Sequence, residues 1–291
     1  MNIGFIGLGL MGRPLALHLA KAGHQLHLWA RRPASEPFKD VAAHAHISAA
    51  EVARHADVVF TMVADGPDVR EVCLGQGGLA SGARAGLIVV DMSTINPNTA
   101  REIGADLAAK GIEFLDAPVS GGEVGAINAA LTIMVGGKSE VFEKVRPLFE
   151  KMGKAVTLIG PCGAGQVAKA CNQILTGVGV MAVAEAFNFA AQSGVDPARV
   201  REALLGGFAY SKILENHGQR MLDRNFKPGF KAWMHQKDLR IVMEEAHRLG
   251  LMLPSSAATA QLFNAIVGSG MGEEDSIAAL KLLEGLSGGK Q

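Results

Sequence analysis

The amino-acid sequence predicts two domains: an α/β domain with a parallel sheet at residues 1–161 and an all-α domain at residues 162–291. Short β-branched runs alternate with helical stretches up to residue 160, and the strand signal nearly disappears after Pro161. The length of 291 residues fits two domains of roughly 150 residues each. With 48% hydrophobic and 19% charged residues, the chain has enough apolar material for a large core, which excludes a disordered protein.

The first domain is expected to place helices on both faces of its sheet. The segments 58–63 and 87–92 are almost entirely apolar, as parallel strands are when both faces are covered. Helices are expected at residues 13–22, 98–110 and 140–152. Strands are expected at residues 2–6, 25–29, 58–63, 87–92, 113–117, 131–135 and 155–159.

The second domain is predicted to open with one long helix at residues 165–193, about 45 Å long at 1.5 Å per residue. Small residues, among them Gly177 and Gly179, keep the middle of this helix thin, so that another helix can pack closely against it. Asp196-Pro197 is typical of the next helix start, because aspartate accepts from free backbone amides and proline fits the first turn.

The charge balance and the apolar runs exclude nucleic-acid-binding, membrane and secreted proteins. Lys+Arg and Asp+Glu are equal at 28 each, which gives no electrostatic basis for binding nucleic acid or an anionic membrane. The apolar run 174–184 is shorter than the roughly 20 residues that cross a bilayer, and no basic segment marks a signal peptide. We therefore expect a soluble, cytoplasmic protein without a membrane or nucleic-acid partner.

No pattern in the sequence predicts a metal site or a disulfide framework. The three cysteines, Cys73, Cys162 and Cys171, are scattered and odd in number, and we expect buried thiols in a reducing compartment. His44 and His46 are the nearest approach to a ligand pair, and we expect them on a polar loop.

Glycine is abundant, at 36 of 291 residues, and a cluster of glycines follows the first predicted strand. Gly7-Leu8-Gly9-Leu10-Met11-Gly12 has the GxGxxG pattern between a strand and a helix, which is typical of a Rossmann-type dinucleotide site. The first glycine permits a tight turn, the second lets the pyrophosphate approach the backbone, and the third lets helix and strand pack closely. The helix N-terminus that follows favours phosphate. The motif is thus predicted to bind cofactor through Gly7, Gly9, Leu10, Met11 and Gly12.

The end of the second predicted strand indicates which dinucleotide binds. An acidic residue there binds the ribose 2′-hydroxyl of NAD, whereas an arginine accommodates the 2′-phosphate of NADP. The sequence has Arg31 and Arg32 after Ala30, and no acid. This favours NADPH and leaves NADH possible as a second cofactor. The alternative interpretation is that both arginines form a solvated basic turn.

A second cluster, Ser120-Gly121-Gly122, ends another predicted strand. Ligands of α/β sheets bind at the carboxyl ends of parallel strands. A serine hydroxyl followed by two unhindered backbone amides can bind a small carboxylate, although a plain β-turn explains the same residues equally well.

A third cluster lies at the start of the long predicted helix. Lys169 and Asn172 are three residues apart and so share a helix face, together with Gln166 and Gln173. A lysine set among apolar residues is a candidate general acid, although most lysines are surface residues that lay their alkyl chain along apolar neighbours.

Together these motifs resemble the β-hydroxyacid dehydrogenase family over essentially the whole chain. The matching segments are residues 4–12, residues 116–122, Gly165-Gln166 with Lys169 and Asn172, and residues 235–239. The resemblance implies an NAD(P)-dependent oxidoreductase acting on a CH–OH group, with a 6-phosphogluconate dehydrogenase-like helical domain, assembled as a homodimer or homotetramer. Segments 116–123, 206–209 and 226–231 are most similar to family members that interconvert tartronate semialdehyde (2-hydroxy-3-oxopropionate) and D-glycerate.

The resemblance also implies a role for each matching residue. Lys169 matches the general acid that protonates the carbonyl oxygen as hydride arrives, and Asn172 orients the substrate beside it. Ser120 is implied to anchor the substrate carboxylate together with Gly121 and Gly122. Lys237 is implied to contact both substrate and cofactor. The remaining positions implied to bind cofactor are Met62, Val63, Thr94, Phe230 and Asp238.

Several alternatives remain open from the sequence. NAD-preferring relatives often carry aspartate where Ala30 stands, so the choice between NADP and NAD is not settled. The substrate is expected to be a small carboxylate-bearing aldehyde or hydroxyacid, with 3-hydroxyisobutyrate, succinic semialdehyde and glyoxylate as alternatives. 6-Phosphogluconate dehydrogenase activity is disfavoured because the long helix lacks a histidine beside its Lys-Asn pair, and imine reductase activity because such enzymes usually replace the lysine. A non-catalytic dinucleotide-binding module has no need of Lys169, Asn172 and the Ser-Gly-Gly turn together.

Overall fold

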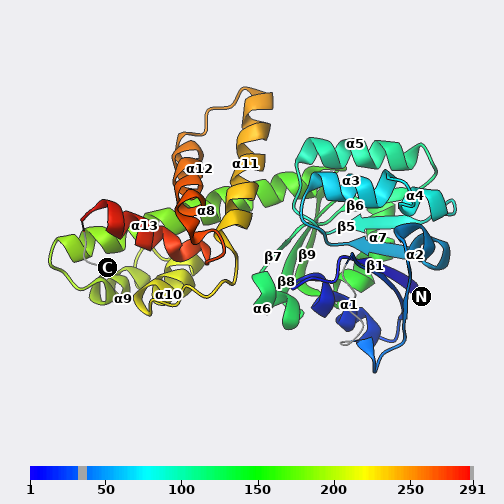
Figure 1. Ribbon diagram of the computed structural model, residues 1–291, viewed down its shortest axis with the longest axis horizontal. Coiled ribbons are helices and arrows are strands. Elements are labelled where there is room, and N and C mark those ends of the chain that lie inside the picture. The colour runs from blue at the N-terminus through cyan, green and yellow to red at the C-terminus, as the bar shows by residue number, and fades with distance from the viewer. Residues whose placement is uncertain (32–37, 289–291) are drawn as a thin grey trace. The chain divides into compact units, whose positions relative to one another are not determined.

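The structure is a computed structural model that describes residues 1–31 and 38–288. These residues form two compact units, Met1–Lys169 and Ala170–Gln291, which run from blue to green and from green to red in Figure 1. Arg32, one of the two arginines predicted to bind cofactor, lies outside the described residues.

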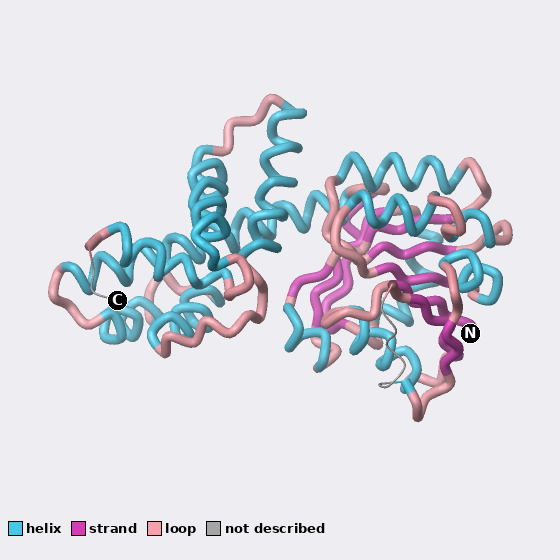
Figure 2. Tube along the Cα trace, in the orientation of Figure 1, coloured by secondary structure: helices cyan, strands magenta, loops and turns pink. Residues whose placement is uncertain are grey.

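The first unit contains a sheet that lies between layers of helices (Figure 2). Its strands are β1 (Asn2–Ile6), β2 (Gln25–Trp29), β3 (Ala43–Ala45), β4 (Val58–Thr61), β5 (Ile88–Asp91), β6 (Glu113–Asp116), β7 (Val119–Ser120), β8 (Leu131–Gly136) and β9 (Gly153–Gly160). Among the described residues the order is β3-β2-β1-β4-β5-β6-β8-β7, with β9 beside β8. Strands β1 to β6 pair in parallel, whereas β8 runs antiparallel to β6 and β7. The strand order reverses between β1 and β4, and doubly wound sheets bind ligands at that switch point.

Helices cover both faces of this sheet. They are α1 (Gly12–Lys21), α2 (Ala49–His55), α3 (Gly66–Leu74), α4 (Leu79–Gly82), α5 (Pro97–Ala108), α6 (Gly122–Ile127) and α7 (Ser139–Phe149). Successive strand residues point to opposite faces. Phe60 of β4 therefore joins the core under α1 and α7, while its neighbour Val59 joins the core under α2, α3 and α5. The predicted parallel sheet with two helical layers is confirmed.

The smallest elements of the first unit were not predicted from the sequence. Strands β3 and β7 have three and two residues, too few to produce a periodic pattern. Helix α2 did carry a signal, since Ser48 and Glu51 have the spacing of a capping box and the Ser48 side chain accepts from the Glu51 amide. Helix α3 is capped by Asp65, whose side chain accepts from the Gly66 amide.

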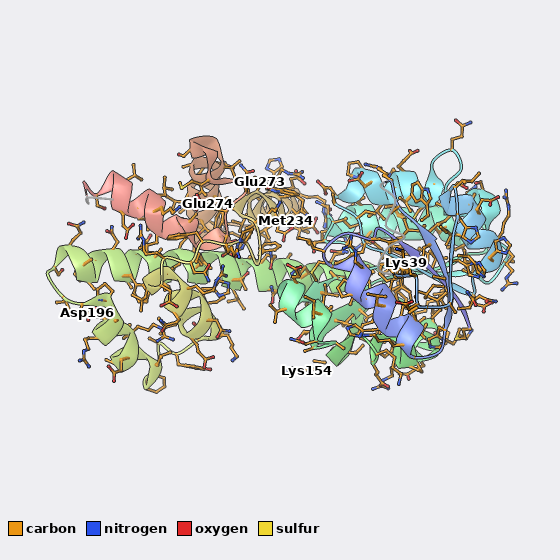
Figure 3. All side chains as sticks on the ribbon, turned by 60° about the horizontal axis from the view of Figure 1, so that its bottom comes forward. Lys39, Lys154, Asp196, Met234, Glu273 and Glu274 are labelled. Atoms are coloured by element: carbon orange, nitrogen blue, oxygen red, sulfur yellow. The ribbon has the colours of Figure 1, made fainter. Side chains whose placement is uncertain are left out.

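The second unit is all helical. Its elements are α8 (Ala164–Gln192), which begins in the first unit, α9 (Pro197–Leu205), η2 (Ile213–His217), α10 (Gly218–Leu222), α11 (Ala232–Leu249), α12 (Pro254–Ile266), η3 (Val267–Met271), η4 (Ser276–Ala278) and α13 (Ala279–Leu286). Phe187 of α8, Leu239 of α11 and Phe263 of α12 meet in its core. A Cβ on Gly177 would lie 3.1 Å from His235 Nε2, so this glycine permits the expected close helix packing. Asp196 caps α9 as predicted (Figure 3).

Helix α8 is more apolar over its length than the run 174–184 indicated. By length and composition, in the described part of the chain, it is the one helix that passes as a membrane-span candidate, with a mean hydropathy of 1.6 over 18 residues. The expectation that no apolar segment is long enough to cross a bilayer is therefore wrong. Alanine, glycine and valine keep the mean hydropathy of α8 high around its isolated polar residues. Core helices of water-soluble proteins pass the same test, and α8 supplies Val180, Met181 and Phe187 to the core of its unit.

The expectation of three buried thiols is wrong for one of them. Cys73 is buried and Cys162 is half-buried, but Cys171 is exposed, and all three are free. Cys171 follows the buried Lys169 by two residues, which places it on the opposite side of α8.

Candidate active site

The glycine-rich turn joins β1 to α1 and combines a tight backbone with open space. Gly7 has a φ of +93°, and a Cβ there would lie 2.1 Å from the Met62 carbonyl oxygen. A Cβ on Gly12 would lie 1.9 Å from the Gly7 carbonyl oxygen, whereas one on Gly9 would meet nothing within 4 Å. The fold therefore requires glycine at positions 7 and 12, and the free space faces Gly9.

The N-terminus of α1 is suited to an anion. No side chain in the described part of the chain caps this helix, and its first turn has no acidic residue. Leu10 is exposed and Met11 is half-buried beside it. Uncapped amides and the helix dipole favour a phosphate group, so these residues fit the dinucleotide pyrophosphate that the motif predicts.

A buried carboxylate that was not predicted from the sequence joins the turns after β4 and β5. Asp91 Oδ1 accepts from Thr61 Oγ1 at 2.8 Å and from Ser93 Oγ at 2.6 Å. Ser93 Oγ in turn accepts from the Val63 amide at 2.9 Å. Burial raises the pKa of Asp91 to about 6. The network fixes Val63 and Ser93, the residue before Thr94. The two segments predicted to bind cofactor, Met62-Val63 and Thr94, therefore lie at the same edge of the sheet.

A second buried carboxylate, Asp116, ends β6 and holds the start of α8. Its Oδ1 accepts from the Gly163 amide at 2.6 Å, and its Oδ2 accepts from the Gln166 amide at 2.9 Å. Burial raises the pKa of Asp116. One turn further along α8, Lys169 is buried with 7% of its surface exposed. The predicted general acid is therefore a buried lysine on a helix whose N-terminus is fixed to the carboxyl edge of the sheet.

The Ser120 turn is the start of a short helix. Ser120 ends β7 and is half-buried, and α6 begins two residues later. Gly121 and Gly122 have φ values of +133° and +61°, which other residues rarely adopt. The two glycines are thus required by the backbone, which leaves their amides unhindered.

The helical unit assembles a separate polar cluster between α8 and α11. Asn172 Nδ2 donates to Gln173 Oε1 at 2.7 Å, and Gln173 Nε2 donates to Asp238 Oδ2 at 2.6 Å. Lys237 Nζ lies 3.1 Å from Asp238 Oδ1. Three predicted site residues, Asn172, Asp238 and Lys237, are therefore joined through Gln173. The sequence indicated the helix face on which Gln173 lies, but not its role.

Phe230 precedes α11 in the same unit. Its amide donates to Asp275 Oδ2 at 3.1 Å, and its ring packs edge-on against His235 with 5.5 Å between the ring centroids. The turn that carries this predicted cofactor residue is thus fixed by a buried aspartate and by the first turns of α11.

Arg31 follows β2 and is exposed at the surface. Its Nη2 donates to Asp68 Oδ1 of α3 at 2.6 Å, and 69% of its side chain is exposed. An ion pair that is this open to water contributes little stability, so a phosphate group can compete with Asp68 for the guanidinium.

The expectation that His44 and His46 lie on a polar loop is wrong for His44 alone, because His46 lies in the connection between β3 and α2. His44 belongs to β3, and His46 Nε2 lies 2.9 Å from His27 Nδ1 on β2. His55 at the end of α2 stacks on His27 and His46, with ring centroids 5.3 Å and 5.1 Å apart. Within residues 1–31 and 38–288, no group of three or more His, Cys, Asp or Glu side chains is arranged to hold a metal ion.

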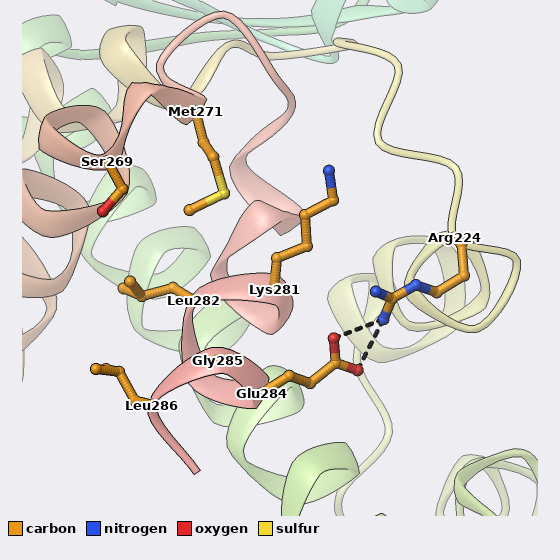
Figure 4. A pocket seen from close by; sticks show the side chains of 8 residues that line it. All are labelled: Arg224, Ser269, Met271, Lys281, Leu282, Glu284, Gly285 and Leu286. Carbon is orange, nitrogen blue, oxygen red and sulfur yellow. Dashed lines mark hydrogen bonds and ion pairs between the residues drawn. The ribbon is translucent and has the colours of Figure 1, made fainter. Parts of the chain in front are cut away.

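A cavity of about 450 Å³ in the helical unit is distinct from these residues (Figure 4). An ion pair between Arg224 and Glu284 crosses its rim, and Lys281 on the same rim pairs with Glu274, which Figure 3 labels. None of the predicted site residues lines this cavity; its lining residues are Arg224, Ser269, Met271, Lys281, Leu282, Glu284, Gly285 and Leu286.

Comparison with known proteins covers nearly the whole chain. Residues 2–160 match the family described as the NAD binding domain of 6-phosphogluconate dehydrogenase, and residues 163–283 match the NAD-binding family of NADP-dependent 3-hydroxyisobutyrate dehydrogenase. The chain is 46% identical to the 2-hydroxy-3-oxopropionate reductase of Escherichia coli K12, over 98% of this chain and 97% of the relative.

Two solved structures share the fold over almost their full length. The 3-hydroxyisobutyrate dehydrogenase of Mycobacterium tuberculosis with L-serine has a TM-score of 0.89 and 31% identity, covering 97% of this chain and 98% of the other. Psf3 in complex with NADP+ and 2-OPP has a TM-score of 0.84 and 25% identity, covering 97% and 99%.

Proposed function

The chain belongs to the β-hydroxyacid dehydrogenase family of NAD(P)-dependent oxidoreductases, and we propose that it interconverts tartronate semialdehyde and D-glycerate. The observation that carries this proposal is near full-length similarity to a reductase named for that substrate, in a chain that retains the buried Lys169. The space beside Gly9 and the uncapped start of α1 fit a dinucleotide.

In this proposal the bound NAD(P)H supplies the hydride that reduces the aldehyde carbon. Hydride addition leaves negative charge on the carbonyl oxygen, and the Lys169 ammonium stabilises that charge and donates the proton that completes the alcohol. Asn172 orients the carbonyl group. The Ser120 hydroxyl, with the backbone amides of Gly121 and Gly122, binds the substrate carboxylate. The reverse reaction uses neutral Lys169 as the base that removes the hydroxyl proton.

Steady-state kinetics on a panel of substrates tests the proposal. Tartronate semialdehyde should give the highest kcat/KM when compared with methylmalonate semialdehyde, succinic semialdehyde and glyoxylate. The methylmalonate semialdehyde/3-hydroxyisobutyrate couple is the second candidate, because the fold neighbour from Mycobacterium tuberculosis is a 3-hydroxyisobutyrate dehydrogenase. Equal or better activity on this branched substrate would overturn the proposed specificity.

The same assay should compare the two cofactors. We propose NADPH as the preferred cofactor, with NADH accepted, because Arg31 and not an acid follows β2. A tenfold or greater preference for NADH would refute the role assigned to Arg31.

We further propose a cytoplasmic homodimer or homotetramer. The exposed Leu175 and Phe189, with 74% and 75% of their surfaces accessible, leave apolar area on α8 that subunit contact can bury. Light scattering of the purified protein should give a mass of two or four chains; a mass of one chain, 30.4 kDa, would contradict this.

A further inference from the structure

Gln166 stands three residues before Lys169 on α8, and its side chain is almost completely buried, with 1% of its surface exposed. Its Oε1 accepts from the Ile95 amide at 3.1 Å, and its Nε2 donates to the Ser93 carbonyl oxygen at 2.8 Å. The amide therefore bonds the residues immediately before and after Thr94. A buried side-chain amide with both its groups paired to one backbone turn fixes that turn in a single position.

A second side chain, that of Asp91, also holds the Thr94 turn. Ser93 is held from the other direction by Asp91, through its hydroxyl at 2.6 Å and its amide at 3.2 Å. That anchor fixes the start of the turn but does not reach Ile95. Gln166 holds the far side of the turn through the Ile95 amide.

The backbone of Gln166 is fixed as firmly as its side chain. Its amide donates to Asp116, which also holds Gly163. A Cβ on Gly165 would lie 2.4 Å from the Met134 carbonyl oxygen, so the first turn of α8 lies directly on the sheet backbone. Lys169 follows by three residues on the same helix, and so its position follows that of Gln166.

From these contacts we infer that Gln166 is a positioning residue, which holds the Thr94 cofactor turn in register with Lys169. This inference rests on the proposed function, because it takes Thr94 as a cofactor contact and Lys169 as the proton donor. Hydride transfer requires the nicotinamide and the proton donor to be held within fractions of an ångström of their productive geometry. Gln166 links the two segments through one side-chain amide and acts through the backbone that it holds.

The test replaces Gln166 by methionine, which has a similar length and shape but cannot pair with the Ser93 and Ile95 backbone groups. The control is Val145→Ala on α7, a buried core substitution on the opposite face of the sheet. NADPH affinity is measured by fluorescence titration, which needs no substrate. Turnover is measured with NADPH and with NADPH deuterated at the transferred position.

We expect Gln166→Met to weaken NADPH binding at least fivefold and to lower kcat at least tenfold relative to Val145→Ala, with a larger deuterium isotope effect. Gln166→Glu keeps the acceptor for Ile95 but loses the donor to Ser93. Its NADPH affinity and kcat should lie between those of Gln166→Met and Val145→Ala. If both Gln166 variants match Val145→Ala in affinity, kcat and isotope effect at equal loss of Tm, the residue is merely structural and the inference is wrong.

The two proposals fail in distinguishable ways. If the unmodified enzyme does not reduce tartronate semialdehyde, the proposed substrate is wrong, and the affinity comparison still decides whether Gln166 orders the cofactor turn. If the unmodified enzyme is active and Gln166→Met retains its kcat, only the positioning role is refuted.

Discussion

The three glycines of the first turn meet different constraints, and single substitutions should separate them. A Cβ on Gly12 collides with the Gly7 carbonyl, whereas a Cβ on Gly9 enters free space. Gly12→Ala should therefore lower the Tm markedly, while Gly9→Ala should leave the Tm unchanged and weaken NADPH binding by at least about tenfold, or 1.4 kcal/mol. Thermal unfolding and fluorescence titration check both effects. Equal loss of Tm in the two variants would contradict the assignment of the space beside Gly9 to the cofactor.

Lys169 should be separable from the binding machinery by a truncation. Lys169→Ala removes the proposed proton donor without touching the glycine turn or the Asp91 network. Turnover should fall by at least about 10²-fold, the usual contribution of a positioned general acid, while NADPH affinity stays within threefold. The matched control is Lys110→Ala on the surface beyond α5, an exposed lysine that should change neither quantity. Unchanged turnover in Lys169→Ala would exclude the lysine from the mechanism.

At the scale of elements, buried aspartates fix the turns between helices and strands. In the helical unit Asp275 is 1% exposed and accepts from the Gly229 amide at 2.7 Å and from the Phe230 amide at 3.1 Å. It also pairs with Arg220 at 3.1 Å and caps η4. One side chain thus joins the turn before α11 to the helices near the C-terminus.

Asp275→Ala should destabilise the protein by about 3 kcal/mol, because it leaves backbone amides without their buried acceptor. The control is Asp223→Ala, which removes an exposed carboxylate after α10 and should cost less than about 0.5 kcal/mol. Urea unfolding of both variants makes the comparison. A loss of stability no larger than that of Asp223→Ala would show that water replaces the lost acceptor.

Long or strongly patterned elements were predictable, and contacts between distant residues were not. Strand β1 and strand β2 have the predicted bounds, and α8 differs from the prediction by one residue at each end. The glycine turn was predictable because its chemistry is local. The Asp91, Gln166 and Gln173 contacts join residues 30 to 73 positions apart, or depend on which residue faces a neighbouring helix. Neither periodicity nor composition carries that information.

At the scale of the whole molecule, buried histidines and buried carboxylates respond to pH in opposite directions. Burial and the neighbouring His46 and His55 lower the pKa of His27 from 6.5 to about 4. The unfolded chain therefore takes up this proton first, and the stability that His27 contributes is lost as the pH falls from about 6.5 toward 4. Burial likewise lowers the pKa of His24, His46 and His217.

Asp91 has the opposite sign, because burial raises its pKa from 3.8 to about 6. The folded protein binds this proton first, so Asp91 contributes stability below pH 3.8 that is lost as the pH rises toward 6. Between about pH 4 and 6 the two groups oppose one another, which flattens the pH dependence of the free energy of unfolding. Above pH 6 Asp91 is ionised in both the folded and the unfolded chain, and the lowered pKa values of the histidines should still raise the stability toward pH 7.

Asp91→Asn removes the opposing group and should expose the response of the histidines. The asparagine keeps an oxygen that accepts from Thr61 and Ser93, so the Asp91 network can persist without a titrating proton. The free energy of unfolding of this variant should fall more steeply between pH 6 and 4 than that of the unmodified protein, by up to about 1.4 kcal/mol per pH unit. Urea unfolding at half-unit pH steps measures both slopes, and His27→Gln should flatten the curve instead. Parallel curves for Asp91→Asn and the unmodified protein would mean that Asp91 titrates alike in the folded and unfolded chains.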